Sequence, residues 1–242
     1  MNLFLSKIRN RWFRLCTARK SLHPLAGANL VSLDYLDRSL KARCYRYVIV
    51  DLETTGLDFG KDRIVSVGAV RVENGNILLG HTFDELVNPG REISPSSIRI
   101  HGITPDMVTH ARSEEEVFND FLDFLGNDIV VAHHAQFDLH FLNRVMKKSH
   151  GFPLQNLVLD TVLMCKSIVF PPHPYPYGID LNSRQFSLDA VAKHFHIEIH
   201  GRHTALGDAM ATAMIFQRII SMLESQGPGR LRDLVKVSGI AF

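Results

Sequence analysis

Two carboxylates stand two positions apart in this sequence, directly after a strongly apolar run. Asp51 and Glu53 follow YVIV, a β-branched run that is typical of a buried strand. Because side chains alternate along a strand, both carboxylates would point to one face, about 6 to 7 Å apart. Ionised carboxylates that close repel and raise each other's pKa, so a shared proton, a basic partner or divalent cations must compensate. The alternative is that the strand ends here and both side chains reach water.

A third carboxylate, Asp138, follows the apolar run DIVV, where a helix is expected to begin. In α/β proteins the ends of neighbouring strands and the helices after them surround one ligand site, so Asp138 can meet the first two carboxylates. Taken alone, an aspartate at this place indicates only a helix start, where the helix dipole favours a negative charge.

His203 and Asp208 lie five residues apart in RHTALGDA. On one helix this spacing is about 500°, which places the two side chains on different faces. They can share a site if His203 lies in the loop before the helix and Asp208 in its first turn, with Thr204 as the N-cap. Taken alone, the segment favours a surface histidine and a helix-start aspartate.

The residues after Glu53 predict a ligand-binding turn. Thr54, Thr55 and Gly56 supply two hydroxyl groups and a glycine, which permits a tight turn and a close approach of the main chain to a ligand. Main-chain N–H groups there could hold a phosphate or a terminal hydroxyl group.

The elements that would position these residues form an α/β pattern. Three antiparallel strands are expected first, with a hairpin turn at Asn74-Gly75. Helices and two more strands then alternate, and Ser113 and Glu116 form a capping box before one of the helices. The expected segments are YVIVDLE, RIVSVGAVRV, NILLGHTFDELV, SEEEVFNDFLDFLG, DIVVAHH, FDLHFLNRVMKKSHG, LQNLVLDT, SLDAVAKHF and a long helix from about 205 to 223, with an exposed Pro-rich loop, FPPHPYPYG. This pattern predicts an RNase H-like α/β fold, a mixed five-stranded sheet flanked by helices.

Composition limits the class of protein. The chain has 242 residues, 45% of them hydrophobic, which is enough for one large domain with an extension. No uncharged apolar run approaches the roughly 18 to 20 residues that cross a bilayer, and the charged opening is a poor signal peptide. Three widely spaced cysteines fit reduced thiols. We therefore expect a cytoplasmic protein without a membrane span.

The net charge of +2 hides a strong division along the chain. Residues 1–46 carry ten basic and two acidic residues, a charge of +8, and the remaining 196 residues carry −6. We expect a basic N-terminal extension and linker at 1–45, with a short amphipathic helix, and one domain at 46–242. The extension could pack on the domain, contact nucleic acid or a membrane surface, or serve as a transit peptide.

Together the motifs resemble the DEDDh family of 3′–5′ exonucleases, in particular its DnaQ-like branch, which includes the epsilon subunit of bacterial DNA polymerase III and stand-alone relatives. VDLETTGL, AHHAQFDLHFLN and HTALGDA are similar to the three exonuclease motifs, and VNPG with HGIT is similar to the segment between the first two. The resemblance covers residues 46 to 224 and leaves out the basic extension.

The resemblance implies a metal-dependent hydrolase. Asp51, Glu53, Asp138 and Asp208 would hold two divalent cations, Mg²⁺ or Mn²⁺, and His203 would act as general base. The implied reaction releases nucleoside 5′-monophosphates from the 3′ end of DNA, with single-stranded or mispaired ends preferred. Because the sequence shows no polymerase domain, the resemblance favours a stand-alone enzyme or one loosely associated with a DNA polymerase.

The family pattern also assigns the contacts to the terminal nucleotide. Thr54, Thr55, Gly56 and Leu57 would hold it, and His101 and His134 would line the pocket. Two positions depart from the epsilon pattern: His134 stands where asparagine is usual, and Gly207 where an acidic residue is common.

Two other functions stay open. The RNA exonucleases of the RNase T and oligoribonuclease type share the four carboxylates and the histidine, although oligoribonuclease usually has M-T-G-L where this chain has T-T-G-L. A non-catalytic nucleic-acid-binding module is the second alternative, but such a module has no physical need for a repulsive carboxylate cluster. Metal dependence discriminates between a nuclease and a binding module.

Overall fold

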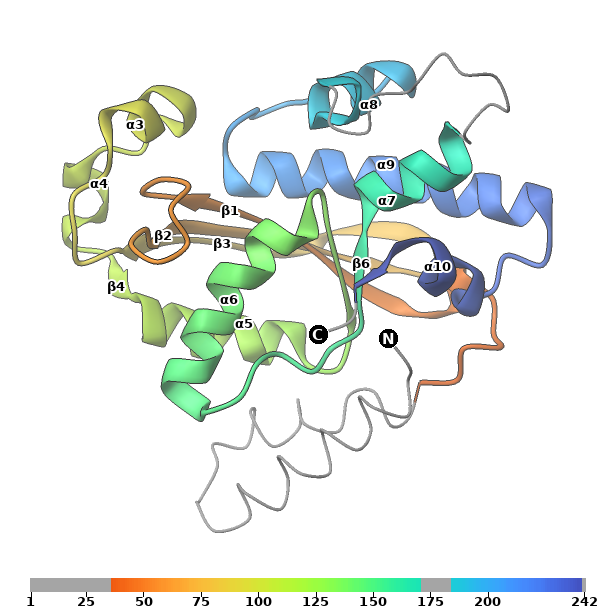
Figure 1. Ribbon diagram of the computed structural model, residues 1–242, viewed down its shortest axis with the longest axis horizontal. Coiled ribbons are helices and arrows are strands. Elements are labelled where there is room, and N and C mark those ends of the chain that lie inside the picture. Colours follow the sequence, from red (N-terminus) through yellow and green to blue (C-terminus); the bar gives the residue numbers. More distant parts are fainter. Residues whose placement is uncertain (1–35, 171–183, 241–242) are drawn as a thin grey trace, which may run out of the picture.

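The computed structural model describes residues 36–170 and 184–240. Its centre is a mixed sheet with the strand order β4-β3-β2-β1-β5-β6-β7 (Figure 1). The strands are β1 (Arg46–Thr54), β2 (Ile64–Glu73), β3 (Asn76–Asn88), β4 (Arg112–Ser113), β5 (Ile129–Ala132), β6 (Val158–Asp160) and β7 (Gly239–Ile240). β1, β2 and β3 pair antiparallel, whereas β5 and β6 are parallel to β1. The mixed α/β sheet is therefore confirmed.

The five expected strands are β1, β2, β3, β5 and β6, and two further strands of two residues each extend the sheet at its edges. β4 pairs with the end of β3 and β7 with β6. Two residues are too few to show a strand periodicity, so the sequence gives no sign of either.

The hairpin between β2 and β3 forms where the sequence predicts it. Asn74 and Gly75 both have positive φ angles, 53° and 76°. A two-residue hairpin turn with the twist of its flanking strands requires such angles, and asparagine and glycine tolerate them best. This turn places the two longest strands of the sheet side by side.

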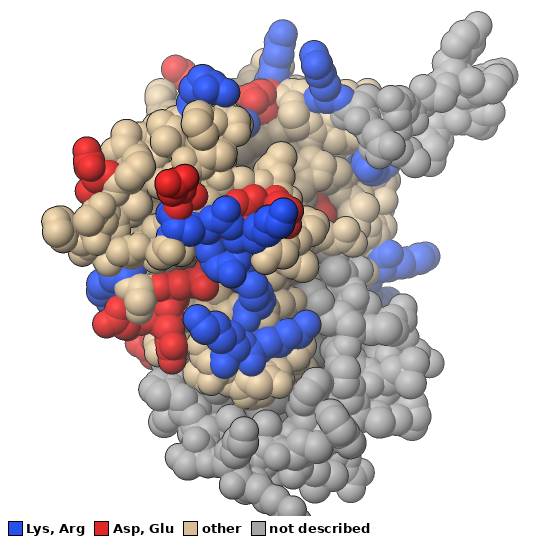
Figure 2. Space-filling model, turned by 60° about the vertical axis from the view of Figure 1, so that its left-hand side comes forward, with Lys and Arg blue, Asp and Glu red and all other residues tan. Residues whose placement is uncertain are grey.

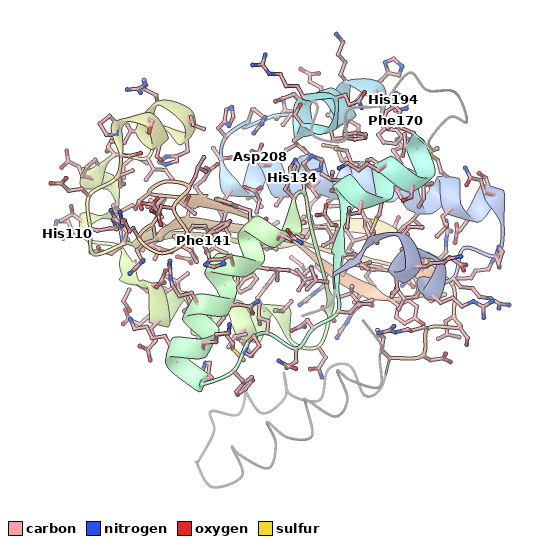
Figure 3. All side chains as sticks on the ribbon, viewed as in Figure 1. His110, His134, Phe141, Phe170, His194 and Asp208 are labelled. Carbon is pink, nitrogen blue, oxygen red and sulfur yellow. The ribbon has the colours of Figure 1, made fainter. Side chains whose placement is uncertain are left out.

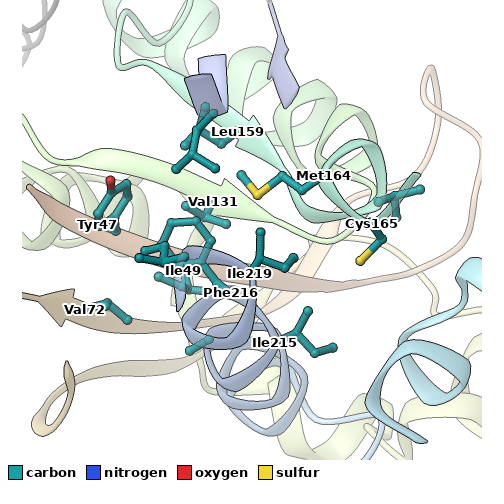
Figure 4. Close-up of a cluster of buried hydrophobic side chains, with 14 of the residues drawn as sticks. Tyr47, Ile49, Val72, Val131, Leu159, Met164, Cys165, Ile215, Phe216 and Ile219 are labelled. Carbon is teal, nitrogen blue, oxygen red and sulfur yellow. The ribbon is translucent and has the colours of Figure 1, made fainter. Parts of the chain in front are cut away.

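Helices cover both faces of the sheet. On one face α5 (Glu114–Leu125) and α6 (Ala135–His150) pack on Val48 and Val50 of β1. On the other face, α9 (Ala205–Gln226) packs on the alternate residues Tyr47 and Ile49, together with α7 (Thr161–Met164), α8 (Leu188–His194) and α10 (Leu231–Ser238). Figure 4 shows this second cluster, in which the rings of Tyr47 and Phe216 meet edge to face at 4.7 Å. Asp51 and Glu53 continue the alternation of Tyr47 and Ile49, so they belong to the α9 face.

The helix ends follow the expected signals. Ser113 and Glu116 form the capping box of α5, and Gly151 ends α6 in a left-handed conformation. The hydroxyl group of Thr204 accepts a hydrogen bond from Gly207 N at 3.1 Å, which confirms Thr204 as the N-cap of α9. Asp208 consequently lies in the first turn of α9.

Two short helices between β3 and α5 were not expected, α3 (Pro95–His101) and α4 (Pro105–Thr109). Each begins with a proline after a Ser or Thr N-cap, a typical helix start. At seven and five residues they are too short for a helical hydrophobic period to be recognised. They stand beside the loop that follows β1 (Figure 1).

Residues 36–45 pack on the body. Ala42 is fully buried, its main-chain oxygen accepts a bond from the Tyr47 hydroxyl at 2.5 Å, and Arg43 pairs with Glu224 of α9. The expected amphipathic helix of the N-terminal extension and most of the Pro-rich loop lie outside the described residues. The division into an extension at 1–45 and a domain at 46–242 stays a prediction.

α9 is long and apolar enough to cross a membrane by length and composition alone. Half of its most apolar window is buried inside the protein, and its residues Ile215, Phe216 and Ile219 are fully enclosed by the sheet and the neighbouring helices. A core helix has these properties.

Candidate active site

Three carboxylates from two elements meet at the end of β1. One oxygen each of Asp51, Glu53 and Asp208 lie within 4.8 Å of one another. Glu53 and Asp208 are 9% and 5% exposed, and Asp51 is half-buried. The alternative that the strand simply ends in water at Asp51 and Glu53 is therefore wrong.

A glycine brings α9 to this position. Gly68 of β2 is the register partner of Asp51, and a Cβ atom at Gly68 would lie 2.1 Å from the main chain of Ala205. Only a residue without a side chain lets the first turn of α9 lie directly on the sheet at this point. The close approach carries Asp208 to Asp51.

Asp138, at the start of α6, completes the acidic group. It is 3% exposed, and its Oδ1 accepts a hydrogen bond from the main-chain N of Leu52, between Asp51 and Glu53, at 3.1 Å. Its charge is the largest influence after burial on the pKa of Asp51. The prediction that strand ends and helix starts bring the four carboxylates together is confirmed geometrically, although Asp138 lies outside the tight group of three.

Burial and mutual repulsion together raise the pKa values of these groups. Burial raises the pKa of Asp51 and Asp138 well above the usual range, and neighbouring carboxylates raise both further. Burial, followed by the charge of Asp208, raises the pKa of Glu53 to about 8. The site is therefore short of positive charge.

The donor set fits divalent cations. Closely spaced carboxylate oxygens are hard ligands, of the kind that Mg²⁺ and Mn²⁺ prefer. Asp51, Glu53 and Asp208 could share one cation, and Asp138 could contribute to a second one beside Asp51.

His203 lies in the loop before α9, as its spacing from Asp208 requires. It has a left-handed main chain with φ 64°, and its N–H donates to Oδ1 of Asp208 at 3.3 Å. His203 is partly exposed, and its ring Nδ1 lies 3.1 Å from Nη1 of Arg202, which also bonds to Asp208. This position suits a group that exchanges protons with a bound molecule.

Arg202 is the main feature of the site that the sequence did not reveal. Its guanidinium donates to Asp208 and makes two bonds to Asp189 of α8, at 2.8 and 3.1 Å. Its charge opposes the raised pKa values of Asp51, Glu53 and Asp208. No sequence motif predicts this role, because it depends on the contact between Arg202 and Asp189, which lie 13 residues apart in the chain.

In the predicted nucleotide-binding turn, most polar atoms are already hydrogen-bonded to other residues of the chain. The Thr55 side chain is 1% exposed, its hydroxyl group donates to Asp62 at 2.7 Å, and its main-chain N and O bond to Arg63 and Ser94. Thr55 thus has no polar atom left for a nucleotide. A Cβ at Gly56 would lie 2.4 Å from the Asp62 carboxylate, so this glycine makes room for Asp62.

Thr54 is buried like Thr55, whereas Leu57 is open to solvent. The Thr54 hydroxyl donates to the main-chain oxygen of Gly56 at 2.7 Å, which closes the turn. Leu57 is 80% exposed, an unusual place for a large apolar side chain. A contact of Leu57 with a nucleotide stays a prediction that this exposure permits.

His101 and His134 approach the site from two helices. His101 Nδ1 accepts from Ile103 N at 3.0 Å, so its Nε2 is the donor to the Thr54 oxygen at 3.3 Å, and burial lowers its pKa. His134 is exposed at the start of α6 with φ 63°, at the same end of the sheet as Asp208 (Figure 3). Only His134 of the two offers an open ring.

Two further buried groups support the site and were not expected. Asp160, at the end of β6, accepts bonds from Val162 N at 2.8 Å and Ala135 N at 3.2 Å, and so ties the starts of α7 and α6 together. His133 bonds to Thr161 and to the main-chain oxygen of Phe186, both at 2.8 Å. Both residues immediately follow strand runs, which is the signal that could have identified them.

The fold and this acidic centre define a class: an α/β nuclease with a carboxylate site suited to divalent cations. Comparison with known protein families matches residues 48–216 to the family described as Exonuclease, or RNase T. A DNA polymerase III subunit epsilon from Aquifex aeolicus is 36% identical over 73% of this chain and 81% of its own length. This chain belongs to the exonuclease family, in its DnaQ-like branch.

Other relatives are much longer. A PolC-type DNA polymerase III from Thermotoga petrophila is 38% identical over 78% of this chain, which spans only 13% of that polymerase. A DNA polymerase III subunit epsilon-like protein from Rhodobacter capsulatus is 42% identical over 75% of this chain and 24% of its own length.

Solved structures show the same fold. Exonuclease X, in complex with 5′ overhanging duplex DNA, has a TM-score of 0.58 and 26% identity over 78% of this chain and 98% of its own. E. coli Exonuclease I, in complex with a dT13 oligonucleotide, has a TM-score of 0.62 and 18% identity over 75% of this chain and 42% of its own. The RNase H-like architecture is thus confirmed.

Proposed function

We propose that this enzyme is a metal-dependent 3′–5′ exonuclease that removes nucleoside 5′-monophosphates from DNA. The observation that carries the proposal is the convergence of four carboxylates and His203 at one end of the sheet. A buried cluster of like charges is unfavourable in a purely structural role, and cations that bind phosphate would relieve it. This argues against the alternative of a non-catalytic binding module.

The residues divide the work. Asp51, Glu53, Asp138 and Asp208 would hold two divalent cations, which when bound neutralise phosphate charge and make water a better nucleophile. His203 would accept the proton of the attacking water at its ring. Leu57 and His134, both exposed, would orient the terminal nucleotide.

The preferred substrate is proposed to be single-stranded DNA. Phe59, two residues after the exposed Leu57, is 43% exposed, and its ring stacks on the His140 ring at 4.2 Å. Exposed aromatic and apolar surfaces beside a nuclease site bind unpaired bases, which a duplex would keep stacked on one another. Of the structural neighbours, E. coli Exonuclease I is bound to a dT13 oligonucleotide, which is in line with this choice, whereas Exonuclease X is bound to duplex DNA with a 5′ overhang.

Basic side chains line the same side of the site. Arg63, Arg91 and Arg144 converge on the main-chain oxygens of Lys61 and Asp62. Figure 2 brings this side forward and shows basic side chains gathered next to acidic ones. Local positive charge of this kind would attract a phosphate backbone to a body that is otherwise net acidic.

A direct assay tests the proposal. The purified chain is given 5′-labelled DNA as single strand and blunt duplex, and RNA of the same sequence, with Mg²⁺ or Mn²⁺ and with chelator. We expect the DNA single strand to shorten one nucleotide at a time from its 3′ end, with nucleoside 5′-monophosphate as product. Chelator should abolish the reaction. Preferential degradation of RNA would establish the RNase T-type alternative instead.

Isosteric variants test the site. Asp51→Asn should lower kcat about a thousandfold, equal to about 4 kcal/mol of transition-state stabilisation, and His203→Asn about a hundredfold. Asp84→Asn is the matched control, because Asp84 lies exposed on β3. Full activity of Asp51→Asn would overturn the proposed mechanism.

An association with a DNA polymerase is a further part of the proposal. It is supported by relatives named as epsilon subunits and PolC-type polymerases. Co-purification of the chain with a DNA polymerase from its own cells is the measurement that decides it.

A further inference from the structure

Arg202 connects the acidic centre to α8. From the loop before α9 it makes a forked pair with both carboxylate oxygens of Asp189, in the first turn of α8. The Arg202 side chain is 28% exposed and that of Asp189 is 62% exposed. The guanidinium is therefore held on its solvent side by Asp189.

The inner end of the same guanidinium contacts the site. Nη1 of Arg202 donates to Oδ2 of Asp208 and lies 3.1 Å from Nδ1 of His203. One nitrogen atom thus holds a proposed metal ligand and the proposed general base. The side chain of Asp208 is 7% exposed, so this bond is shielded from water.

The Asp208 carboxylate can bind two kinds of cation, the Arg202 guanidinium and a divalent metal ion. A divalent ion shared with Asp51 and Glu53 needs a lone pair of the Asp208 carboxylate, and the bond to Arg202 uses this group. Arg202 would also repel an ion placed among these oxygens, because its charge reaches all three carboxylates. The guanidinium and the ion therefore compete for Asp208.

We propose that Arg202 is the counter-ion of the acidic centre in the absence of metal. When a divalent cation binds, the Arg202 guanidinium must release Asp208 but keeps its two bonds to Asp189. Arg202 stabilises the cluster without metal and weakens its affinity for metal. Because Nη1 also touches His203, the release frees the ring of the general base in the same movement. This inference rests on the proposed metal-dependent function.

Arg202 and Asp189 should then have opposite effects on metal affinity. Without Arg202 the competitor is gone, so the cluster binds a divalent cation more tightly. Without the charge of Asp189 the guanidinium loses its outer anchor and is drawn more strongly to Asp208, so the cation binds less tightly. A purely structural role of the pair would weaken binding in both variants.

The experiment is a calorimetric titration of Mn²⁺ into the full chain, stripped with chelator and free of nucleic acid. We expect Arg202→Gln to bind Mn²⁺ about tenfold more tightly than the wild type and Asp189→Asn several-fold less tightly. Arg218→Gln is the matched control for the lost charge, because Arg218 is exposed on α9, ten residues or about 15 Å beyond Asp208. It should leave the affinity unchanged.

Thermal unfolding in chelator is the second readout. Arg202→Gln should lower Tm, and added Mn²⁺ should raise its Tm more than it raises that of the wild type. If Arg202→Gln does not fold, Arg202→Lys retains the charge without the fork and should bind Mn²⁺ more tightly than wild type by a smaller factor.

If the Arg202 variants bound Mn²⁺ only as tightly as the wild type or more weakly, the proposed competition between Arg202 and the cation would be wrong. Wild-type protein that neither binds Mn²⁺ nor degrades DNA would overturn the proposed function itself.

Discussion

The two walls of the site differ in the contacts that hold them next to the carboxylates. In the loop wall, residues 54–63, Asp62 accepts hydrogen bonds from the Thr55 hydroxyl and from Asp58 N, at 2.7 and 2.8 Å, and further bonds lie within the loop. In the helix wall, residues 187–208, ion pairs join Arg202 to Asp189 and Asp208, in addition to the hydrogen bonds that cap α9. The loop wall is thus shaped before any ligand arrives, whereas cations can rearrange the helix wall.

This difference separates two tasks. A nucleotide-binding surface gains affinity when its shape is fixed in advance, because no ordering cost remains. A metal centre built from four carboxylates needs a compensating charge that can leave. Gly201 and His203 have positive φ angles of 71° and 64°, so the turn that carries Arg202 is itself an uncommon conformation.

The largest loss of stability is expected from a substitution at Gly68, where the start of α9 lies directly on the sheet. Gly68→Ala would force a Cβ atom into the main chain of α9, 2.1 Å away, which cannot move aside as a side chain could. We expect a loss of about 3 kcal/mol in the free energy of unfolding and a strong loss of activity. Urea denaturation measures the first, with Gly80→Ala as control, since a Cβ at Gly80 meets nothing within 4 Å.

Acid should loosen the helix wall before the loop wall. Burial lowers the pKa of His133 to about 4, and this ring holds the main-chain oxygen of Phe186, directly before α8. The unfolded chain binds the proton near pH 6.5, so the contribution of neutral His133 to stability is complete above that value and falls by about 3 kcal/mol between pH 6.5 and 4.

Denaturation at several pH values tests this sign. His133→Gln should be less stable at pH 7.5 but should lose less on acidification than the wild type. His140→Gln, at an exposed histidine, is the control. An unchanged slope in His133→Gln would refute the assignment.

Removal of Asp62 should damage the loop wall alone. Asp62→Ala leaves the Thr55 hydroxyl and Asp58 N without their acceptor, which costs about 2 kcal/mol. Because Leu57 is then less well placed, KM for single-stranded DNA should rise severalfold while Mn²⁺ affinity is unchanged. Glu92→Ala, at an exposed acidic residue outside the loop, is the control. A change in Mn²⁺ affinity would show that the walls are not independent.

The smallest effect is expected for Thr54→Val. This change removes the hydroxyl bond to the Gly56 oxygen and keeps the shape of the side chain, at a cost of about 1 kcal/mol. KM should rise less than twofold, as steady-state kinetics would show. A rise larger than that of Asp62→Ala would make the Thr54 hydroxyl a direct contact to the substrate.

The sequence predicts the helix wall's position better than its contacts. The place of Asp208 follows from the Thr204 cap, a local signal that the structure confirms. The partnership of Arg202 with Asp189 depends on how α8 packs, and no local pattern encodes that. The same limit applies to Asp62, whose bond to Thr55 spans a turn of irregular form.

The glycines show why residue types can mislead. Gly56 suggests space for a ligand in the sequence, but the space is used by the Asp62 carboxylate. Gly68 attracts no notice inside an apolar strand, yet its missing side chain sets the distance between β2 and α9. Both roles are defined by neighbours that lie far away in sequence or across a turn.

The bond from Leu52 N to Asp138 has a consequence for how substitutions are tolerated. The pairing of β1 with β5 ends at Ile49, so the Asp138 carboxylate takes the place of a strand partner beyond it. The donor is a main-chain group, which every residue except proline provides. The carboxylate of Asp138 is therefore anchored to a main-chain group that no substitution at position 52 other than proline removes.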